Sequence, residues 1–257
     1  MDLIEAADVS PRHRHPWELA RLWVLRHLIA RRVRIDAQST VVDIGCGDAF
    51  VIGELARLLP EARFCGIDAA FTPETAAARE RTLPSNVRLY QTLDAVPPGG
   101  AAALILLMDV LEHIQDDGAF LANVLERSWV GPETQFIVTV PAYQALFSAH
   151  DVFLKHFRRY TNRQLRDRLE QAGLRVTDIG YFFASLLPLR ILTVIKERLS
   201  PAAAVDATGL SEYGGGGATT AVLSAVLKAD AFAALLLGRI GISVPGLSNY
   251  AICRTSA

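Results

Sequence analysis

The segment from residue 41 to 48, Val-Val-Asp-Ile-Gly-Cys-Gly-Asp, constrains the fold of this chain more than any other segment. An apolar run leads into an acidic residue and then into two glycines spaced two apart. This pattern is typical of a parallel strand that ends in a tight turn, where the absent side chains let a ligand approach the backbone.

A second acidic residue, Asp68, ends the next apolar run, about 20 residues after the two glycines. A Rossmann-type fold places a carboxylate that binds a ribose at this position. Two acidic strand ends around a Gly-x-Gly turn therefore predict a ligand that contains a nucleoside.

The rest of the chain alternates strand-like and helix-like segments. Apolar runs predict seven strands, at 40–44, 62–67, 87–91, 101–108, 135–140, 174–182 and 249–254. Apolar periodicity and capping residues predict helices at 16–34, 50–59, 118–127, 162–172, 186–199 and 219–238. This order predicts an α/β fold, a Rossmann-like, doubly wound, mostly parallel seven-stranded sheet with an N-terminal helical arm and an inserted helical cap.

The same pattern divides the chain into four parts. We expect the arm at 1–38, a core at 39–183, the helical cap at 184–248 and the last strand of the core at 249–257. Four consecutive glycines at 214–217 are costly to order, and they predict a mobile hinge between the two helices of the cap.

Composition excludes some classes of protein. A length of 257 residues suits one α/β domain with a helical addition, and a net charge of −1 provides no cationic field for general nucleic-acid binding. Three cysteines, each in or beside a predicted strand, favour buried thiols in a reducing cytoplasm. The first residues lack a signal-peptide pattern. Lys228 and Asp230 interrupt the most apolar segment, so we expect no transmembrane helix.

Three segments together resemble the class I S-adenosylmethionine-dependent methyltransferases. They are Asp-Ile-Gly-Cys-Gly at 43–47, Asp68, and Met-Asp-Val-Leu-Glu-His-Ile at 108–114 after the fourth strand. The strand pattern from 40 to 182 agrees, so the resemblance covers more than half of the chain. Ala49 departs from the pattern, because the family often has a third glycine there. The resemblance implies S-adenosylmethionine as cofactor.

The resemblance also assigns roles around that cofactor. Gly45 and Gly47 would let the backbone approach its methionine portion and ribose, and Asp68 would accept hydrogen bonds from the ribose hydroxyls. The cofactor contacts implied in full are Asp43, Gly45, Cys46, Gly47, Asp68, Ala69, Thr92, Leu93, Met108 and Asp109. Helix capping is the alternative role for Asp68, and Asp109 can combine capping with cofactor binding.

A downstream segment, His-Asp-x4-His-x-Arg-Arg-Tyr at 150–160, resembles a bacterial subgroup of these methyltransferases. The N-terminal segment 14–21 resembles the same subgroup and is expected to form a lid-like arm over the cofactor cleft. The substrate contacts that follow from this resemblance are Trp17, Tyr143, Asp151, Arg159 and Tyr160.

Several interpretations of segment 150–160 remain open. His150 or His156 is a candidate general base, with His113 as a third candidate. The neighbouring arginines suit an anionic substrate. The set of His150, Asp151 and His156 has ligand types that suit a divalent metal, but its spacing matches no strong template, so no metal is predicted. The structural alternative is that ion pairs between Asp151 and the arginines fix the segment.

We therefore expect a cytoplasmic methyltransferase that acts on a small molecule, by O-methylation of an apolar or anionic metabolite. Alternatives are C- or N-methylation of a natural-product or lipid-linked intermediate, and a non-catalytic cofactor-binding partner subunit. A nicotinamide oxidoreductase fits poorly, because the chain has no Tyr-x3-Lys pair. The apolar segments 186–199 and 219–238 are expected to cap the acceptor, to form a homodimer interface or to contact a membrane surface.

Overall fold

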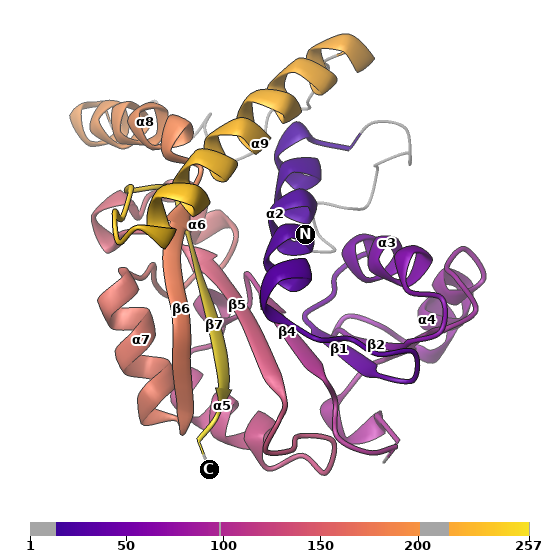
Figure 1. The fold of residues 1–257 in the computed structure, drawn as a ribbon. Coiled ribbons are helices and arrows are strands. Elements are labelled where there is room, and N and C mark those ends of the chain that lie inside the picture. Colours follow the sequence, from indigo (N-terminus) through magenta and orange to yellow (C-terminus); the bar gives the residue numbers. More distant parts are fainter. Residues whose placement is uncertain (1–13, 98, 201–215, 257) are drawn as a thin grey trace.

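A computed structural model describes residues 14–97, 99–200 and 216–256, and it shows one twisted sheet with helices on both faces (Figure 1). The strands are β1 (Thr40–Ile44), β2 (Arg63–Ile67), β3 (Val87–Tyr90), β4 (Leu104–Met108), β5 (Gln135–Pro141), β6 (Leu174–Phe182) and β7 (Ser248–Thr255). The α-helices are α2 (Pro16–Arg32), α3 (Phe50–Leu58), α4 (Pro73–Glu80), α5 (Asp117–Leu125), α6 (Ala149–Phe153), α7 (Asn162–Gln171), α8 (Leu187–Leu199) and α9 (Gly217–Arg239). Short 3₁₀ helices are η1 (Leu93–Ala95), η2 (Leu111–His113), η3 (Gln144–Leu146) and η4 (Ala184–Leu186).

The sheet order is β3-β2-β1-β4-β5-β7-β6. Neighbouring strands are parallel except for β7, which runs antiparallel to both β5 and β6. The strand order reverses between β1 and β4, and open α/β sheets bind ligands in the crevice at the carboxyl ends of such strands. The predicted seven-stranded, mostly parallel sheet is confirmed, and its switch point falls at the Gly-x-Gly turn.

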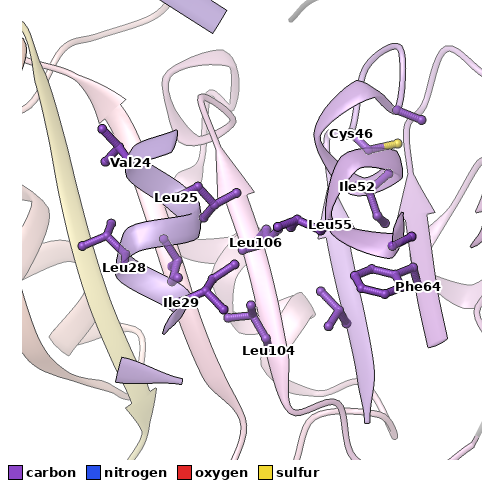
Figure 2. Close-up of a cluster of buried hydrophobic side chains, with 14 of the residues drawn as sticks. Val24, Leu25, Leu28, Ile29, Cys46, Ile52, Leu55, Phe64, Leu104 and Leu106 are labelled. Carbon is purple, nitrogen blue, oxygen red and sulfur yellow. The ribbon is translucent and has the colours of Figure 1, made fainter. Parts of the chain in front are cut away.

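Alternate residues of the central strands face opposite layers of helices. Val41 of β1, with Leu104 and Leu106 of β4, packs in the cluster that contains α2 and α3, as Figure 2 shows for the residues of β4. Val42 and Ile105 point the other way, into the cluster that contains α5 and α7. By the same period of two, Asp43 and Met108 face the side of α2.

The turn after β1 has an unusual backbone, and this explains its composition. Gly45 has a φ of +73°, and a Cβ there would lie 2.6 Å from Cγ2 of Val110. Ala49, at the N-cap of α3, also adopts the left-handed region, with a φ of 58°. Glycine populates this region freely, whereas an L side chain is strained there. The third glycine that the resemblance led us to expect is thus replaced by a strained alanine.

Two helices were not expected from the sequence, and several bounds differ. α4 and the five-residue α6 were not predicted, α2 ends at Arg32 rather than at residue 34, and β4 begins at Leu104 rather than at residue 101. Residues 1–13 of the predicted arm lie outside the described residues. So do Gly214 and Gly215 of the predicted hinge, whereas Gly217 begins α9. All three cysteines are free and buried, as predicted.

α8 and α9 are inserted between β6 and β7 and lie beyond the sheet at one end of the molecule (Figure 1). α9 packs against α2 and β6, with Leu227, Ala231 and Leu235 in the shared core. By length and composition α9 is nevertheless able to cross a membrane, in contrast to the expectation from Lys228 and Asp230. Only 28% of its most apolar window is buried, so much of the helix presents apolar side chains outward.

The strained turn yields a stability prediction. Ala49→Gly should raise the free energy of unfolding by roughly 0.5–1 kcal/mol, because relief of left-handed strain exceeds the loss of a buried methyl group. Gly45→Ala should lower the free energy by about 2 kcal/mol or more, through strain and collision with Val110. Urea unfolding without cofactor measures both. Gly99→Ala, whose Cβ would meet nothing closer than 3.6 Å, is the matched control with an effect near zero.

Candidate functional site

A cleft lies at the carboxyl ends of β1 and β4, covered on one side by α2. Its lining comes from α2, the turn after β1, the start of α3 and the end of β4. The lining residues are Trp17, Glu18, Arg21, Asp43, Gly45, Cys46, Asp48, Phe50, Val51 and Met108. The structure thus brings four of the predicted cofactor contacts, Asp43, Gly45, Cys46 and Met108, into one cleft, together with Trp17, which was predicted to contact the substrate.

Asp68 is tied to the glycine turn. One carboxylate oxygen accepts a hydrogen bond from the backbone N–H of Gly47 at 2.9 Å, and the other accepts from the N–H of Ala70 at 3.0 Å. Each carboxylate oxygen has a second lone pair, so both can accept further hydrogen bonds. The side chain is therefore oriented in advance to accept a pair of ribose hydroxyls, and it also holds the turn.

α2 is fastened over the cleft by two charged clusters. Arg21 pairs with Asp109 and donates to Oγ1 of Thr139 at 3.1 Å, while its guanidinium stacks on Trp17. Arg14 pairs with Asp48, which also accepts a hydrogen bond from Arg79. These contacts come from residues far apart in sequence, so they fix the position of α2 relative to β1 and β4.

Asp43 is a buried carboxyl group at the base of the cleft. It is 2% exposed, and burial raises its pKa from 3.8 to about 7, with a further contribution from the nearby Asp68. Within the described residues Asp43 forms no ion pair. A cation placed in the cleft would stabilise its ionised form, and the sulfonium and ammonium groups of S-adenosylmethionine are such cations.

The remaining predicted cofactor contacts lie around the cleft. Thr92 follows β3 and is exposed, Leu93 begins η1, and Ala69 is exposed next to Asp68. Asp109 follows β4 with a φ of 54° and pairs with Arg21 rather than pointing freely into solvent. Contacts of these residues with a cofactor stay predictions.

Asp151 organises the downstream segment. Its buried carboxylate accepts hydrogen bonds from Nε of Arg159 at 2.7 Å, from Arg190 of α8 at 2.7 Å and from the backbone N–H of Ser148 at 3.0 Å. Nδ1 of His156 lies 2.9 Å from the same carboxylate. Together these partners hold the pKa of Asp151 well below its usual range, even though burial acts in the opposite direction.

Neighbouring side chains anchor the segment in the same way. Tyr160 donates a hydrogen bond to Asp117 at 2.7 Å, and Arg158 forms an ion pair with Asp117 at 2.9 Å. The predicted ion pair between Asp151 and Arg159 is therefore confirmed, whereas Arg158 pairs with Asp117 and not with Asp151. Asp151, Arg159 and Tyr160 are buried, so a direct contact of these three with substrate stays a prediction, as it does for Tyr143, which stacks on Tyr181.

Two of the three candidate histidines lie together. The rings of His113 and His156 are 4.6 Å apart between centroids, at nearly right angles. The backbone N–H of Phe157 donates to the carbonyl of Glu112 at 2.7 Å, which holds the downstream segment against η2. His150 does not belong to this pair. Burial, reinforced by Arg190, lowers the pKa of His150 and favours its neutral ring.

Glu112 lies beside this histidine pair and was not singled out from the sequence. Its side chain is fully buried, and neither carboxyl oxygen has a hydrogen-bond partner among the described residues. Burial, with Asp109 as the next cause, raises the pKa of Glu112 well above its usual value. The sequence offered one signal of a functional role for Glu112, which is its position in the segment Leu-Glu-His shortly after the central strand β4. Arg21 and Arg190 were also missed, because only their long-range partners reveal them.

The combination of this sheet order, glycine turn and acidic strand ends defines a nucleoside-binding α/β protein of the methyltransferase class. A family model described as "Methyltransferase domain" matches residues 17–179, which is well over half of the chain. The chain belongs to this methyltransferase family, and S-adenosylmethionine is its cofactor.

Curated relatives match part of the chain. Trans-aconitate 2-methyltransferase of Azoarcus sp. (strain BH72) is 31% identical over 102 residues, 40% of this chain and 39% of the relative. Ubiquinone biosynthesis O-methyltransferase of Methylobacterium sp. (strain 4-46) is 36% identical over 88 residues, 33% of this chain and 34% of the relative. The match therefore spans between a third and two fifths of the length of these curated relatives.

Solved structures share the fold over nearly the whole chain. The [4+2]-cyclase SpnF has a TM-score of 0.57 at 17% identity, with 99% of this chain and 92% of that chain covered. A protein described as a "putative sarcosine dimethylglycine methyltransferase from Galdieria sulphuraria" has a TM-score of 0.55 at 14% identity, with 93% of this chain and 86% of that chain covered. Coclaurine N-methyltransferase bound to N-methylheliamine and SAH has a TM-score of 0.53 at 10% identity, with 91% and 70% covered.

The residues present fit this cofactor. Gly45 lines the cleft with its backbone, Asp68 presents two oriented acceptor oxygens, and Asp43 forms no ion pair within the described residues. Asp68 would hold the ribose, while Asp43 would supply negative potential near the positively charged methionine portion. When bound, the cofactor supplies an activated methyl group.

The ribose role of Asp68 gives a binding prediction. Asp68→Ala should weaken S-adenosylmethionine binding by more than tenfold in titration calorimetry, because two charge-assisted hydrogen bonds are lost. Asp68→Asn, which keeps one acceptor oxygen, should show a smaller loss. Asp167→Ala, on α7 with a side chain that is 54% exposed, is the matched control. Equal cofactor affinity in Asp68→Ala and wild type would contradict the ribose role.

The raised pKa of Asp43 gives a prediction about pH. A raised folded-state pKa means that the stabilising contribution of Asp43 is complete below about pH 4 and is lost as pH rises towards 7. Asp43→Asn mimics the neutral carboxyl, so without cofactor the variant should gain stability over wild type across this interval. The gain in the free energy of unfolding is at most about 4 kcal/mol at pH 8, because the pKa of Asp43 is raised by about three units. Urea unfolding at pH 4 and pH 8 measures it, and a difference that does not change with pH would contradict the assignment.

Proposed function

We propose that this protein transfers the methyl group of S-adenosylmethionine to an oxygen of an apolar small molecule. The observation that carries this proposal is the histidine pair, His113 and His156, on the segments that follow β4 and β5. An oxygen nucleophile must lose a proton, and imidazole groups are suited to promote this loss near neutral pH. His156 is oriented by the buried carboxylate of Asp151, an arrangement that fixes the ring and its tautomer.

Methyl transfer places few other chemical demands on the protein. The sulfonium is already activated, so the enzyme aligns the acceptor oxygen, the methyl group and the sulfur, and excludes water. Alignment of this kind can lower the barrier by roughly 7–11 kcal/mol. α2 contributes to it here, because Trp17 and Arg21 form one wall of the cleft and would limit the positions open to the acceptor.

The apolar character of the acceptor is supported by the surface around the inserted helices. Among the described residues, the exposed large apolar side chains are Leu58 and the following set: Val152, Phe153, Phe157, Leu189, Ile191, Leu192, Ile195, Leu199, Val222, Leu223, Val226, Phe232, Leu236, Ile240 and Ile242. We call this second set the apolar cap surface. Its residues lie on or next to α6, α8 and α9, whereas an ordinary soluble surface carries exposed apolar residues singly.

We further propose that the apolar cap surface rests on an anionic lipid bilayer, from which an apolar or lipid-linked acceptor is taken. Exposed Lys155, Lys196, Arg198 and Arg239 lie among its apolar side chains. A surface that combines exposed apolar residues with cations is typical of interfacial membrane binding. A homodimer that buries the same surface is the alternative, and the experiment below separates the two.

The histidine pair gives a kinetic prediction. With S-adenosylmethionine labelled in its methyl group and an extract of apolar metabolites as acceptor source, His156→Ala should lower the rate of label transfer by 10²-fold or more. Cofactor affinity in calorimetry should stay within about twofold of wild type, because His156 does not line the cofactor cleft. His150→Ala should also slow transfer, to a smaller extent. Normal transfer in both variants would exclude these histidines from proton removal, and no transfer by wild type would favour a non-catalytic subunit.

The lipid contact gives a further prediction. Wild-type protein should co-sediment with vesicles of phosphatidylcholine containing about one third phosphatidylglycerol, and binding should fall as salt is raised. Leu192→Asp and Leu199→Asp, both at exposed positions, should reduce co-sedimentation at least tenfold without loss of thermal stability. Leu58→Asp, exposed on α3 away from the apolar cap surface, is the control. A dimer in sedimentation equilibrium that these substitutions dissociate, with no vesicle binding, would overturn the lipid contact.

A further inference from the structure

The structure contains a cluster of potential metal ligands beside the cofactor cleft, formed by Glu112, His113 and His156. Each side chain can offer one ligand atom, and these atoms lie within 4.8 Å of one another. η2 carries the first two residues directly after β4, and the third comes from the segment after α6. The hydrogen bond between Phe157 and Glu112 holds these two segments together.

A second observation points to a ligand at this place. The carboxyl group of Glu112 is fully buried, and neither of its oxygens has a hydrogen-bond partner among the described residues. Buried polar groups in folded proteins are almost always satisfied by protein, water or an ion. A carboxylate left without a partner beside two imidazole rings is therefore an incomplete site.

The orientation of His156 also fits a metal ligand. Its Nδ1 is engaged by Asp151 at 2.9 Å, which leaves Nε2 as the atom that can coordinate. Metal-binding histidines commonly donate their other ring nitrogen to a carboxylate, which fixes the ring and raises its basicity. Asp151 is itself held by Arg159 and Arg190, so this outer contact is rigid.

We infer that Glu112, His113 and His156 bind one divalent zinc ion. Two imidazole nitrogens and one carboxylate oxygen form the ligand set of open, catalytic zinc sites, in which a fourth position stays free for water or substrate. Magnesium and calcium prefer sets of oxygen ligands, so the two imidazoles argue against them. Tetrahedral ligands about 2.1 Å from zinc lie roughly 3.4 Å apart, and side-chain rotation can close the spacing seen here to that value.

The zinc ion would activate the acceptor in the proposed methyl transfer, and this catalytic role rests on the proposed function. An acceptor hydroxyl in the open position of the zinc ion would have a lowered pKa, so its proton would pass to solvent and the oxygen would be left as the nucleophile. Binding of the metal itself does not depend on methyl transfer. His156 then acts as a ligand, which is consistent with the loss of turnover expected for His156→Ala.

The test measures metal binding and methyl transfer separately. Full-length protein is stripped with a chelator and titrated with Zn²⁺ against a chromophoric competitor, and with Co²⁺ as a spectroscopic probe. Wild type should bind one Zn²⁺ per chain and show visible Co²⁺ absorption typical of four or five ligands. Glu112→Gln, which keeps the size of the side chain, and His156→Asn should each weaken Zn²⁺ binding at least tenfold.

Controls make the outcomes unambiguous. His27→Asn removes a histidine of α2 outside the cluster and should leave Zn²⁺ affinity unchanged. Zn²⁺ should raise the melting temperature of wild type but not of Glu112→Gln, and the metal-free melting temperatures show that both proteins are folded. Absence of stoichiometric Zn²⁺ binding, or equal affinity in wild type and both cluster variants, would overturn the site. Zinc binding without methyl transfer would contradict the proposed function alone, and methyl transfer by metal-free protein would contradict the catalytic role of the zinc ion alone.

Discussion

The buried carboxylate of Asp151 is the interaction on which the segment around His156 depends, the segment that we propose as the acceptor side. It accepts hydrogen bonds from Arg159, from Arg190 of α8 and from the N–H that begins α6, and it contacts His156. A fully buried anion is costly unless cations and donors surround it, and removal of one partner from such a site typically costs about 3–5 kcal/mol. The positions of α6, α8 and the His156 ring are thus set by one charge.

Asp43 is also buried, but its pKa is shifted in the opposite direction from that of Asp151. Both carboxyl groups are buried, but Asp151 has two guanidinium partners, whereas Asp43 forms no ion pair among the described residues. The pKa of Asp151 therefore falls, and that of Asp43 rises to about 7. Arg14, just before α2, and Arg21 of α2 are already paired with other carboxylates. The cleft is consequently left with an unneutralised acid, which suits the positively charged cofactor that we expect to bind there.

Much of the fold and of the cofactor side could be predicted from the sequence, because both depend on local signals. Apolar runs of β-forming residues mark strands, and all seven strands were predicted. α4 was not predicted, because Ala76 is its one buried residue and the helix therefore carries no apolar stripe. α6 is five residues long, and its capping box of Ser148 and Asp151 was the sole local signal. The proximity of Glu112 to His156 was not predictable, since it depends on how two distant segments pack.

The two sides of the site also differ in what holds them. On the cofactor side, the strand ends and the turn are fixed by β1 and α3, and the inserted helices contribute through α9, which packs against α2. The acceptor side is held by Arg190, through which α8 reaches the carboxylate that orients His156. Since the outer surface of α8 carries much of the exposed apolar area, any displacement of α8 on binding a partner changes the ion pair of Asp151. The guanidinium of Arg190 therefore links the position of α8 to the carboxylate that orients His156.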